Sequence, residues 1–326
     1  MMPNNLAVVI LNWNGKNWLE KFLPSVVSFS QNADIYIIDN LSTDDSIPFV
    51  QTHFPTVKII RNNKNYGFAG GYNEGLKEIK NEYYCLLNSD VEVTENWINP
   101  VLDLFQKDSS ISAIQPKILS FNNKKQFEFA GAAGGLIDNL GYPYCRGRIF
   151  DDLEEDKGQY DDETEIFWAS GCCFFIRSKD FWEQNGFDER FFAHQEEIDL
   201  CWRLINSGKK IFYTGRSKVY HVGGGTLNKQ SAQKTYLNIR NNLSMMLKNL
   251  PFPKLVWLIF FRLCLDGIAG IYFGLKNGFP HLWAVVRAHF GFYGQLQQTW
   301  KLRQKHQKSE FYQSKWLIFK HFLGGK

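Results

Sequence analysis

The chain has 326 residues, of which 44% are hydrophobic and 16% aromatic, and its formal net charge at pH 7 is +4. This length accommodates one large α/β domain with an appendage, or two domains, and the composition is that of a folded protein. The six cysteines form no CxxC pair and no regular framework, which argues against a structural zinc site and a disulfide scaffold. The first strand pattern is not preceded by the features of an export signal, so we expect a cytoplasmic protein.

The net charge is unevenly distributed. Residues 1–225 contain 22 Lys and Arg against 31 Asp and Glu, whereas residues 226–326 contain 15 against 2. We therefore expect two regions, 1–225 and a basic, aromatic-rich region 226–326. Clustered basic residues suit an anionic membrane surface or a nucleic acid. The long apolar stretches among them favour the membrane, and we expect no nucleic-acid partner.

Strand and helix signals alternate through the first part of the chain. Short β-rich runs predict strands at residues 6–12, 34–39, 57–61 and 83–88. Helical spacing after polar starts predicts helices at residues 16–30, 44–54, 70–80 and 95–107. This βαβ alternation predicts an α/β fold whose mainly parallel sheet is covered by helices on both faces.

The pattern changes after the fourth helix. Gly-rich and then acidic residues predict a hairpin and a solvated loop at about residues 126–165. A buried strand interrupted by Gly171 is predicted at residues 166–177, a helix at 196–207, and a short strand at 209–213, before a loop that contains His221.

Polar residues follow each of the first four strands, at the edge where open sheets of this kind bind ligands. They are Asn12 and Asn14, then Asp39 and Asn40, then Asn62 to Asn65, and finally Asn88 to Asp90. Glu196 and Glu197 open the helix at residues 196–207. Asp90 and this glutamate pair predict the two halves of one active site.

Each acidic residue also has a simpler explanation. Asp90 is suited to cap the helix that follows it. Glu196 and Glu197 complement a helix dipole, which is worth ~0.3–1 kcal/mol. Asp199 and Arg203 are spaced i,i+4 and predict a structural ion pair.

Three glycines and one histidine are also open to two interpretations. Gly67, Gly70 and Gly71 do not fit GxGxxG, which argues against a dinucleotide-binding fold. We expect them to allow the backbone to approach a ligand closely. His221, taken alone, is more often a packed or surface histidine than a metal ligand.

The order of these signals matches a known family. The segments are VVILNWNG at residues 8–15, IIDNLSTD at 37–44, NYGFAGGYN at 65–73, LLNSDV at 86–91, GFDERFF at 186–192 and EEIDLCWR at 196–203. Over roughly residues 6–225 the sequence resembles family 2 glycosyltransferases of the GT-A fold, particularly bacterial rhamnosyltransferases. The resemblance implies a nucleotide-sugar-binding mixed sheet flanked by helices, with a mainly helical C-terminal extension.

Two motifs depart from the family pattern. The usual Asp-x-Asp triplet is Asn88-Ser89-Asp90, which leaves a single metal carboxylate. The usual Glu-Asp pair is Glu196-Glu197, which lengthens the second side chain by one methylene group.

The resemblance also implies the chemistry of the site. The donor would be a nucleotide-diphosphate sugar, and a Mn²⁺ or Mg²⁺ ion held by Asp90 and His221 would meet the charge of the leaving diphosphate. Glu197, with Glu196 beside it, would be the base that accepts the acceptor's proton, worth ~10²–10⁴ in rate. Attack opposite the leaving group would invert the anomeric carbon. The residues assigned to the nucleotide sugar are Asn12, Asn14, Asp39, Asn65, Gly67, Gly70, Gly71, Asn73, Asn88 and Asp90.

The basic region contains one long apolar segment, at residues 255–273. Arg262 and Asp266 near its middle would cost ~5–7 kcal/mol in a bilayer, against ~3–7 kcal/mol gained from eleven Leu, Ile, Val and Phe. Because these two residues can pair on one helix face, we expect a helix that lies on the membrane rather than one that spans it. The alternative is a helical subdomain that closes the acceptor side.

Together these features predict an inverting, metal-dependent glycosyltransferase that transfers a sugar, with rhamnose as the candidate, to a lipid-linked or polysaccharide acceptor. It would work in cell-surface glycan assembly at the inner face of the membrane. A nucleotidyltransferase would need a basic phosphate-gripping loop, for which residues 12–16 are a poor match. The missing second metal carboxylate leaves a non-catalytic sugar-nucleotide-binding or scaffold protein as the other alternative.

Overall fold

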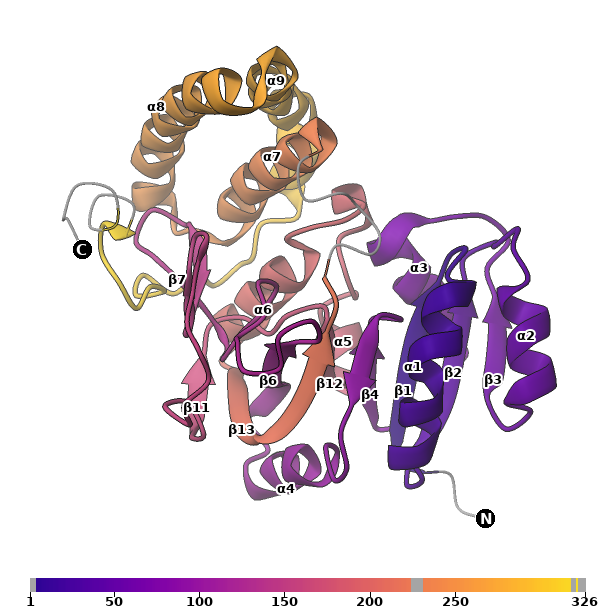
Figure 1. Ribbon diagram of the computed structural model, residues 1–326. Coiled ribbons are helices and arrows are strands. Elements are labelled where there is room, and N and C mark those ends of the chain that lie inside the picture. The colour runs from indigo at the N-terminus through magenta and orange to yellow at the C-terminus, as the bar shows by residue number, and fades with distance from the viewer. Residues whose placement is uncertain (1–3, 224–230, 318–320, 322–326) are drawn as a thin grey trace.

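A nine-stranded mixed sheet forms the centre of the computed structural model, which describes residues 4–223, 231–317 and 321 (Figure 1). The strand order is β11-β13-β6-β12-β4-β1-β2-β3, and β5 pairs with β13. These strands are β1 (Leu6–Asn12), β2 (Asp34–Asp39), β3 (Lys58–Arg61), β4 (Tyr83–Leu87), β5 (Val91–Val93), β6 (Ile111–Ser120), β11 (Glu163–Ile166), β12 (Cys173–Arg177) and β13 (Lys210–His221). A small separate sheet contains β7 (Gly135–Ile137), β8 (Pro143–Cys145), β9 (Arg148–Ile149) and β10 (Asp152–Leu153).

The first four strands confirm the predicted βαβ pattern. β1 pairs in parallel with both β2 and β4, and β2 pairs in parallel with β3. β12 then runs antiparallel to both β4 and β6, which makes the sheet mixed. The carboxyl ends of β1, β2 and β4 therefore meet at one edge of the sheet.

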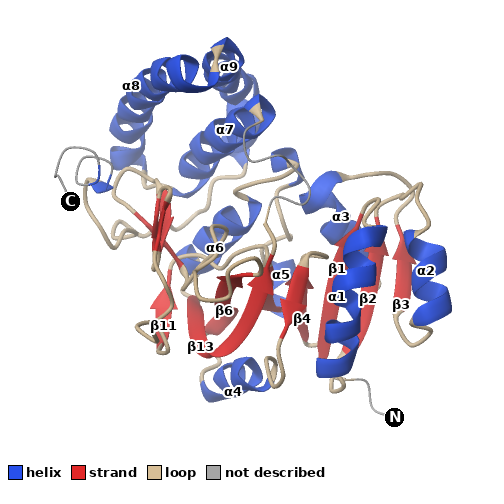
Figure 2. Ribbon diagram, viewed as in Figure 1, coloured by secondary structure: helices blue, strands red, loops and turns tan. Residues whose placement is uncertain are grey.

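Helices cover both faces of this sheet, as Figure 2 shows by colour. α1 (Lys16–Phe29), α2 (Ser46–His53) and α4 (Asn99–Lys107) bury apolar side chains against one face. α3 (Gly67–Leu76), α5 (Ser178–Glu183) and α6 (Glu196–Asn206) cover the other. Alternation along β1 explains the two layers, because Val8 and Ile10 enter the first core and Ala7 and Val9 enter the second.

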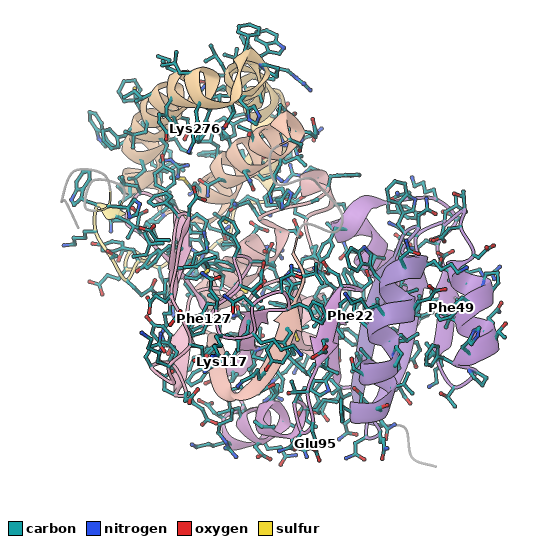
Figure 3. The ribbon with its side chains drawn as sticks, in the orientation of Figure 1. Phe22, Phe49, Glu95, Lys117, Phe127 and Lys276 are labelled. Atoms are coloured by element: carbon teal, nitrogen blue, oxygen red, sulfur yellow. The ribbon has the colours of Figure 1, made fainter. Side chains whose placement is uncertain are left out.

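Several elements differ from the sequence prediction. β5, β6 and α5 were not predicted, and α3 begins at Gly67 rather than at residue 70. β6 was hidden by its polar residues: Lys117 is 1% exposed because its ammonium group pairs with Asp156 at 2.8 Å and also with Asp161 (Figure 3). β13 extends to His221, so this histidine lies on a strand and not in the predicted loop.

Three long helices form the C-terminal region and lie together above the sheet in Figure 1. They are α7 (Ala232–Asn249), α8 (Phe252–Asn277) and α9 (Phe279–Lys301), which confirm the mainly helical extension. The expected boundary between residues 225 and 226 lies outside the described residues. One hydrophobic core nevertheless includes Trp202 and Ile211 from before it and Leu243, Leu255 and Phe292 from after it. The helical region and the sheet therefore share one hydrophobic core.

A buried ionic cluster joins α7 to α6. The Lys248 ammonium group lies 2.7 Å from Asp199 Oδ2 and 2.9 Å from Asp188 Oδ2. Asp199 also accepts hydrogen bonds from Arg203 at 2.8 Å, which confirms the predicted i,i+4 pair, and from Asn249 at 3.0 Å. Burial alone would raise the pKa of Asp188, but Arg190 and Lys248 hold it below its usual range. The cluster will hereafter be called the Lys248 cluster.

Replacing Lys248 with Met should therefore destabilise the protein by about 3–5 kcal/mol, because two carboxylates would be left buried without their cation. The control is Lys179→Met, which removes an exposed pair at 3.8 Å from Glu183 and should cost about 0–1 kcal/mol. Urea unfolding measures both. The difference should shrink as the pH falls through the carboxyl range, because a protonated Asp188 gains nothing from Lys248. Equal losses in the two variants would contradict a stabilising role of the cluster.

Candidate active site

Polar side chains from the ends of β1 and β2 fix the loop that follows β2. Asn12 is paired in register with Asp39, and its side-chain amide donates to the hydroxyls of Ser42 at 3.0 Å and Ser46 at 2.9 Å. Asn14 accepts from the Thr43 backbone amide at 2.7 Å. Asp39 is buried at the strand end. The structure thus brings Asn12, Asn14 and Asp39 together at the predicted edge.

Asn40 connects this edge to α3. Its side-chain amide donates to Asn65 Oδ1 and to the Gly67 carbonyl, both at 2.9 Å, and its own oxygen accepts from Asn62 at 3.1 Å. Asn65 Oδ1 also accepts from the Gly67 amide at 2.9 Å. Asn65 therefore shapes the turn into α3 from within the protein.

The glycines of α3 are closely packed by neighbouring side chains. A Cβ atom on Gly71 would lie 2.9 Å from a Leu11 methyl group, and one on Gly67 would lie 2.6 Å from the Phe192 ring. A Cβ on Gly70 would lie 3.0 Å from Tyr66 Cβ. The protein's own side chains thus fill the space beside these glycines, which explains why larger residues do not fit there; their role in ligand binding stays a prediction.

Asn73 also has a structural environment. Its amide donates to the Phe187 carbonyl at 2.9 Å and to Glu189 at 3.1 Å, and its oxygen accepts from the Phe187 amide at 3.0 Å. These bonds join α3 to the segment that leads towards α6. They use the polar groups of Asn73 inside the protein, and its assignment to the nucleotide cleft stays a prediction.

Strand pairing places His221 beside Asp90. His221 is in register with Val91 where β13 meets β5, and the Val222 amide donates to the Asp90 carbonyl at 3.1 Å. His221 Nε2 consequently lies 3.1 Å from Asp90 Oδ1, and Asn88 Nδ2 lies 3.5 Å from the same nitrogen. The structure therefore unites Asn88, Asp90 and His221, which are 133 residues apart at most.

A carboxylate that sequence reasoning missed lies on the other side of the imidazole. Glu128 Oε2 is 3.2 Å from His221 Nδ1, and both side chains are buried. Burial would lower the pKa of His221, but Cys172, Asp90 and Glu128 together raise it well above its ordinary value. Glu128 lies in the Gly-rich stretch after β6 and fits no motif, so only the fold reveals it.

The donor set fits a divalent cation that takes further ligands from phosphate. A carboxylate and an imidazole nitrogen lie within 3.1 Å of each other, and oxygen and nitrogen donors suit Mn²⁺ or Mg²⁺. Among the described residues, no group of three or more His, Cys, Asp or Glu side chains is arranged to hold a metal ion. Glu128 contacts Nδ1, whereas Asp90 contacts Nε2. Glu128 would therefore orient the imidazole of His221 rather than bind the metal ion.

The glutamate pair begins α6 after a strained segment. Phe192, His194 and Gln195 have φ angles of 64°, 70° and 74°. Such conformations cost about 1–3 kcal/mol each and are kept only where surrounding structure enforces them. Asn241 of α7 holds this segment in place. Its side-chain amide donates to the backbone carbonyls of Phe191 and Ala193 at 3.0 Å and of His194 at 2.8 Å.

Glu196 and Glu197 differ in access to solvent. Glu196 is 4% exposed, and burial followed by the Glu197 charge raises its pKa well above the ordinary range. Glu197 is partly exposed; burial raises its pKa to about 7, although the backbone amides of Glu197, Gly171 and Ile198 oppose the rise. Only Glu197 combines access with a pKa suited to exchange of a proton near neutral pH.

One turn connects the two halves of the site. A Cβ on Gly171 would lie 3.9 Å from the Glu197 carboxyl carbon. The backbone carbonyl of the next residue, Cys172, accepts a hydrogen bond from the backbone amide of Asn88 at 3.0 Å. The Cys172 thiol is one of the groups that raise the pKa of His221. Adjacent Cα atoms are about 3.8 Å apart. Glu197 and the Asp90–His221 pair therefore flank the same turn, residues 171–172.

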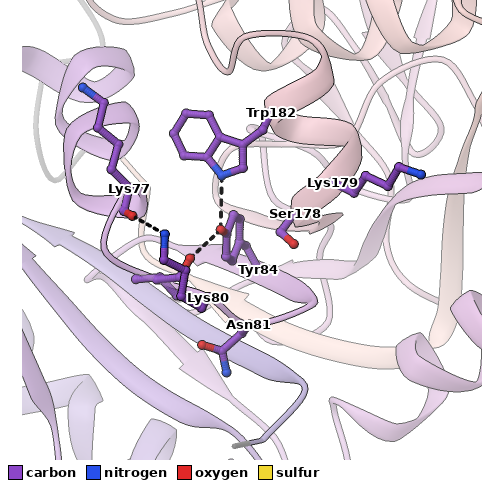
Figure 4. Close-up of a pocket in the computed structure, with 8 residues that line it drawn as sticks. Lys77, Lys80, Asn81, Tyr84, Ser178, Lys179 and Trp182 are labelled. Carbon is purple, nitrogen blue, oxygen red and sulfur yellow. Dashed lines mark hydrogen bonds between the residues drawn. The ribbon is translucent and has the colours of Figure 1, made fainter.

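A separate depression of about 440 Å³ lies at the opposite end of β4 (Figure 4). Its lining includes Tyr84, near the start of β4, and Trp182, whose indole donates to the Tyr84 hydroxyl at 3.2 Å. Its lysines contact neighbouring groups, such as Lys77 with Glu74 at 2.6 Å. This depression is not part of the candidate active site.

Comparison with known proteins identifies the family. Residues 7–184, more than half of the chain, match the family model described as Glycosyl transferase family 2. The chain belongs to this glycosyltransferase family. An N-acetylglucosaminyl-diphospho-decaprenol L-rhamnosyltransferase of Mycobacterium tuberculosis is 24% identical over 237 residues, which cover 68% of this chain and 76% of the relative. The predicted resemblance to rhamnosyltransferases is confirmed.

Solved glycosyltransferase structures confirm the GT-A fold. GalNAc-T7 with UDP, GalNAc and Mn²⁺ superposes with a TM-score of 0.59 at 19% identity, over 75% of this chain and 48% of that one. Mannosyltransferase PcManGT from Pyrobaculum calidifontis, in complex with GDP-Man and Mn²⁺, gives 0.55 at 10% identity, over 90% and 88% of the two chains. Together with the family match and the rhamnosyltransferase relative, this identifies the chain as a glycosyltransferase enzyme rather than a nucleotidyltransferase.

Proposed function

We propose that the protein is an inverting, divalent-metal-dependent glycosyltransferase that uses a nucleotide-diphosphate sugar, with rhamnose as the candidate sugar. The observation that carries this proposal is the 171–172 turn, in which Gly171 lies next to Glu197 and Cys172 lies next to Asn88 and His221, the partner of Asp90. A donor seated over this turn would present its diphosphate to the pair and its anomeric carbon to the base. The nucleotide sugars and Mn²⁺ named for the structural neighbours support the same arrangement.

Asp90 and His221 would bind the cation, with Glu128 holding the imidazole from behind. A bound Mn²⁺ or Mg²⁺ supplies a positive charge that stabilises the departing diphosphate. Carboxylate partners on the second nitrogen orient metal-binding histidines in many proteins. The loss of the usual first carboxylate at Asn88 leaves Asp90 as the single anionic ligand of this motif.

Glu197 would accept the proton from the attacking hydroxyl of the acceptor. Glu197 Oε2 is buried without a hydrogen-bond partner within the described residues, so it would be the oxygen that takes that proton from a bound acceptor. A hydroxyl that attacks from the Glu197 side approaches the anomeric carbon opposite the diphosphate, and substitution then inverts its configuration. Asp39, in the buried strand end beside Asn12, would bind the nucleotide base, and Asn12 and Asn14 would line the same cleft.

The acceptor would be lipid-linked or a polysaccharide, in cell-surface glycan assembly at the inner face of the membrane. The name of the M. tuberculosis relative includes a diphospho-decaprenol acceptor. The excess of basic residues in 226–326, 15 against 2 acidic, supports contact with an anionic membrane surface where such an acceptor would be found.

Metal removal tests the first half of the site. Chelator should abolish transfer, and Asp90→Ala or His221→Ala should greatly weaken Mn²⁺ binding, measured by electron paramagnetic resonance without donor. Glu92→Gln is the control, because Glu92 is on neighbouring β5 and pairs with exposed Lys124. Full turnover in chelator would contradict metal dependence.

Substitution within the glutamate pair tests the second half. Glu197→Gln keeps the size of the side chain but removes its basicity, so transfer should fall about 10²–10⁴-fold while donor affinity stays nearly constant. Glu196→Gln should reduce the chemical step less, because this side chain is 4% exposed. Single-turnover rates and donor titrations separate the two effects. The reverse order of losses would assign the base to Glu196.

The pH dependence follows from the raised pKa of Glu197, about 7. A base must be unprotonated, so kcat/KM should rise with pH through about 7 and level off above it. The rise should disappear in the residual activity of Glu197→Gln. A profile that is flat from pH 5.5 to 8 in the unaltered enzyme would contradict the assignment.

A further inference from the structure

The outward sides of α8 and α9 carry an apolar surface that the fold does not cover. Its large side chains are between 42% and 85% exposed, with Leu275 and Trp257 the most exposed at 85% and 75%. This docking face consists of Phe252, Val256, Trp257, Phe260, Ile268, Ile271, Tyr272 and Leu275 on α8 and Phe279, Trp283, Phe290, Tyr293, Leu296 and Trp300 on α9. Steps of three and four residues place most of the α8 members on one side of that helix. So many exposed large apolar side chains on two neighbouring helices mark an interaction surface.

The opposite side of α8 faces the protein and carries a buried charged pair among apolar side chains. The Arg262 guanidinium group lies 3.5 Å from the centroid of the Tyr142 ring and donates to the Leu140 carbonyl at 2.9 Å. It also lies 3.5 Å from Asp266, and both charged side chains are at most 3% exposed. Leu255, Leu258 and Leu263 of α8 also pack against the core, so the helix has apolar side chains on both its inner and its outer side. In a helix on a water-soluble surface the outer side is polar.

The charges around the docking face are positive. Lys276, Arg287 and Lys301 are exposed on α8 and α9, and Figure 3 labels the first of them. Within residues 231–317, the acidic residues are Asp266, which is buried, and Glu310. The exposed charge beside the apolar face is therefore complementary to an anionic surface.

We infer that the docking face rests on an anionic lipid bilayer, with α8 and α9 lying along the membrane interface. This inference rests on the proposed function, because the bilayer would carry the lipid-linked acceptor. By length and composition α8 is the one helix of the described residues suited to cross a membrane. Crossing would require Arg262 and Asp266 to leave Tyr142 and Leu140 for hydrocarbon, whereas lying in the interface keeps them inside the protein.

The same charges disfavour a second copy of the chain as the occupant. A twofold dimer through the docking face would place the same patch on both subunits. It would bring the basic residues Lys276, Arg287 and Lys301 of the two copies together with few exposed acidic partners. A bilayer that contains anionic lipid covers the apolar side chains and neutralises the basic ones together.

Cys264 provides a probe for this arrangement. It is exposed on α8, whereas the other five cysteines are buried, so a thiol-reactive fluorophore should label it selectively. The full chain is mixed with vesicles of phosphatidylcholine alone or with added phosphatidylglycerol. We expect a blue shift with the anionic vesicles, quenching by lipids that carry a quencher near the headgroup, and binding that weakens as salt is raised.

Paired variants identify the surface. Trp257→Glu with Leu275→Glu should weaken vesicle binding at least tenfold and leave the thermal unfolding curve unchanged, because both side chains are exposed. Phe29→Glu with Ile149→Glu, exposed apolar residues on α1 and β9, is the matched control and should bind as the unaltered chain does. Equal binding by all three proteins would overturn the inference.

The remaining outcomes are equally decisive. Quenching by lipids labelled at the bilayer centre, together with resistance to alkaline carbonate, would show that α8 spans and would overturn it. A dimer in solution that ignores vesicles would assign the face to a second copy. Transfer to a water-soluble acceptor analogue should persist in Trp257→Glu with Leu275→Glu. Vesicle binding without any transfer by the unaltered chain would refute the proposed function and leave the docking face standing.

Discussion

The position of Glu196 and Glu197 depends on the Lys248 cluster. Lys248 comes from α7, yet its two carboxylate partners are on α6 and on the segment that precedes it. Burial of an unpaired charge is costly. The folded state is therefore stable only when Lys248 lies beside both Asp188 and Asp199. α7 is thereby drawn against α6 in one alignment. In that alignment Asn241 of α7 can bind the carbonyls of the strained segment that leads to Glu196 and Glu197.

The helical region thus supports the active site from the side opposite to its proposed membrane face. α7 binds the strained segment, and α8 and α9 present their apolar residues outward. The sheet contributes the other half: β13 pairs with β5 in the register that sets His221 beside Asp90. The turn at residues 171–172 joins both halves, so a donor bound there would contact elements from the beginning, middle and end of the catalytic fold.

The sequence predicted the parallel half of the sheet and the residues at its carboxyl edge, because strand periodicity and strand-end position are local properties. It also predicted the partnership of Asp90 and His221 through the resemblance. It did not predict Glu128, whose importance comes from a contact across 93 positions of the chain. It also did not predict the packing beside Gly67 and Gly71, because a sequence does not tell which side chain, such as Phe192, will lie next to a glycine.

We expect one bound donor to lie between the Asp90–His221 pair and Glu197. The most direct test is a crystal structure with Mn²⁺ and a nucleotide-diphosphate sugar, in which anomalous scattering locates the metal. We predict Mn²⁺ bound by Asp90 Oδ1, His221 Nε2 and diphosphate oxygens, with the Glu197 carboxylate on the side of the anomeric carbon opposite the diphosphate. Mn²⁺ held without Asp90 and His221, or a donor whose anomeric carbon lies away from Glu197, would contradict this expectation.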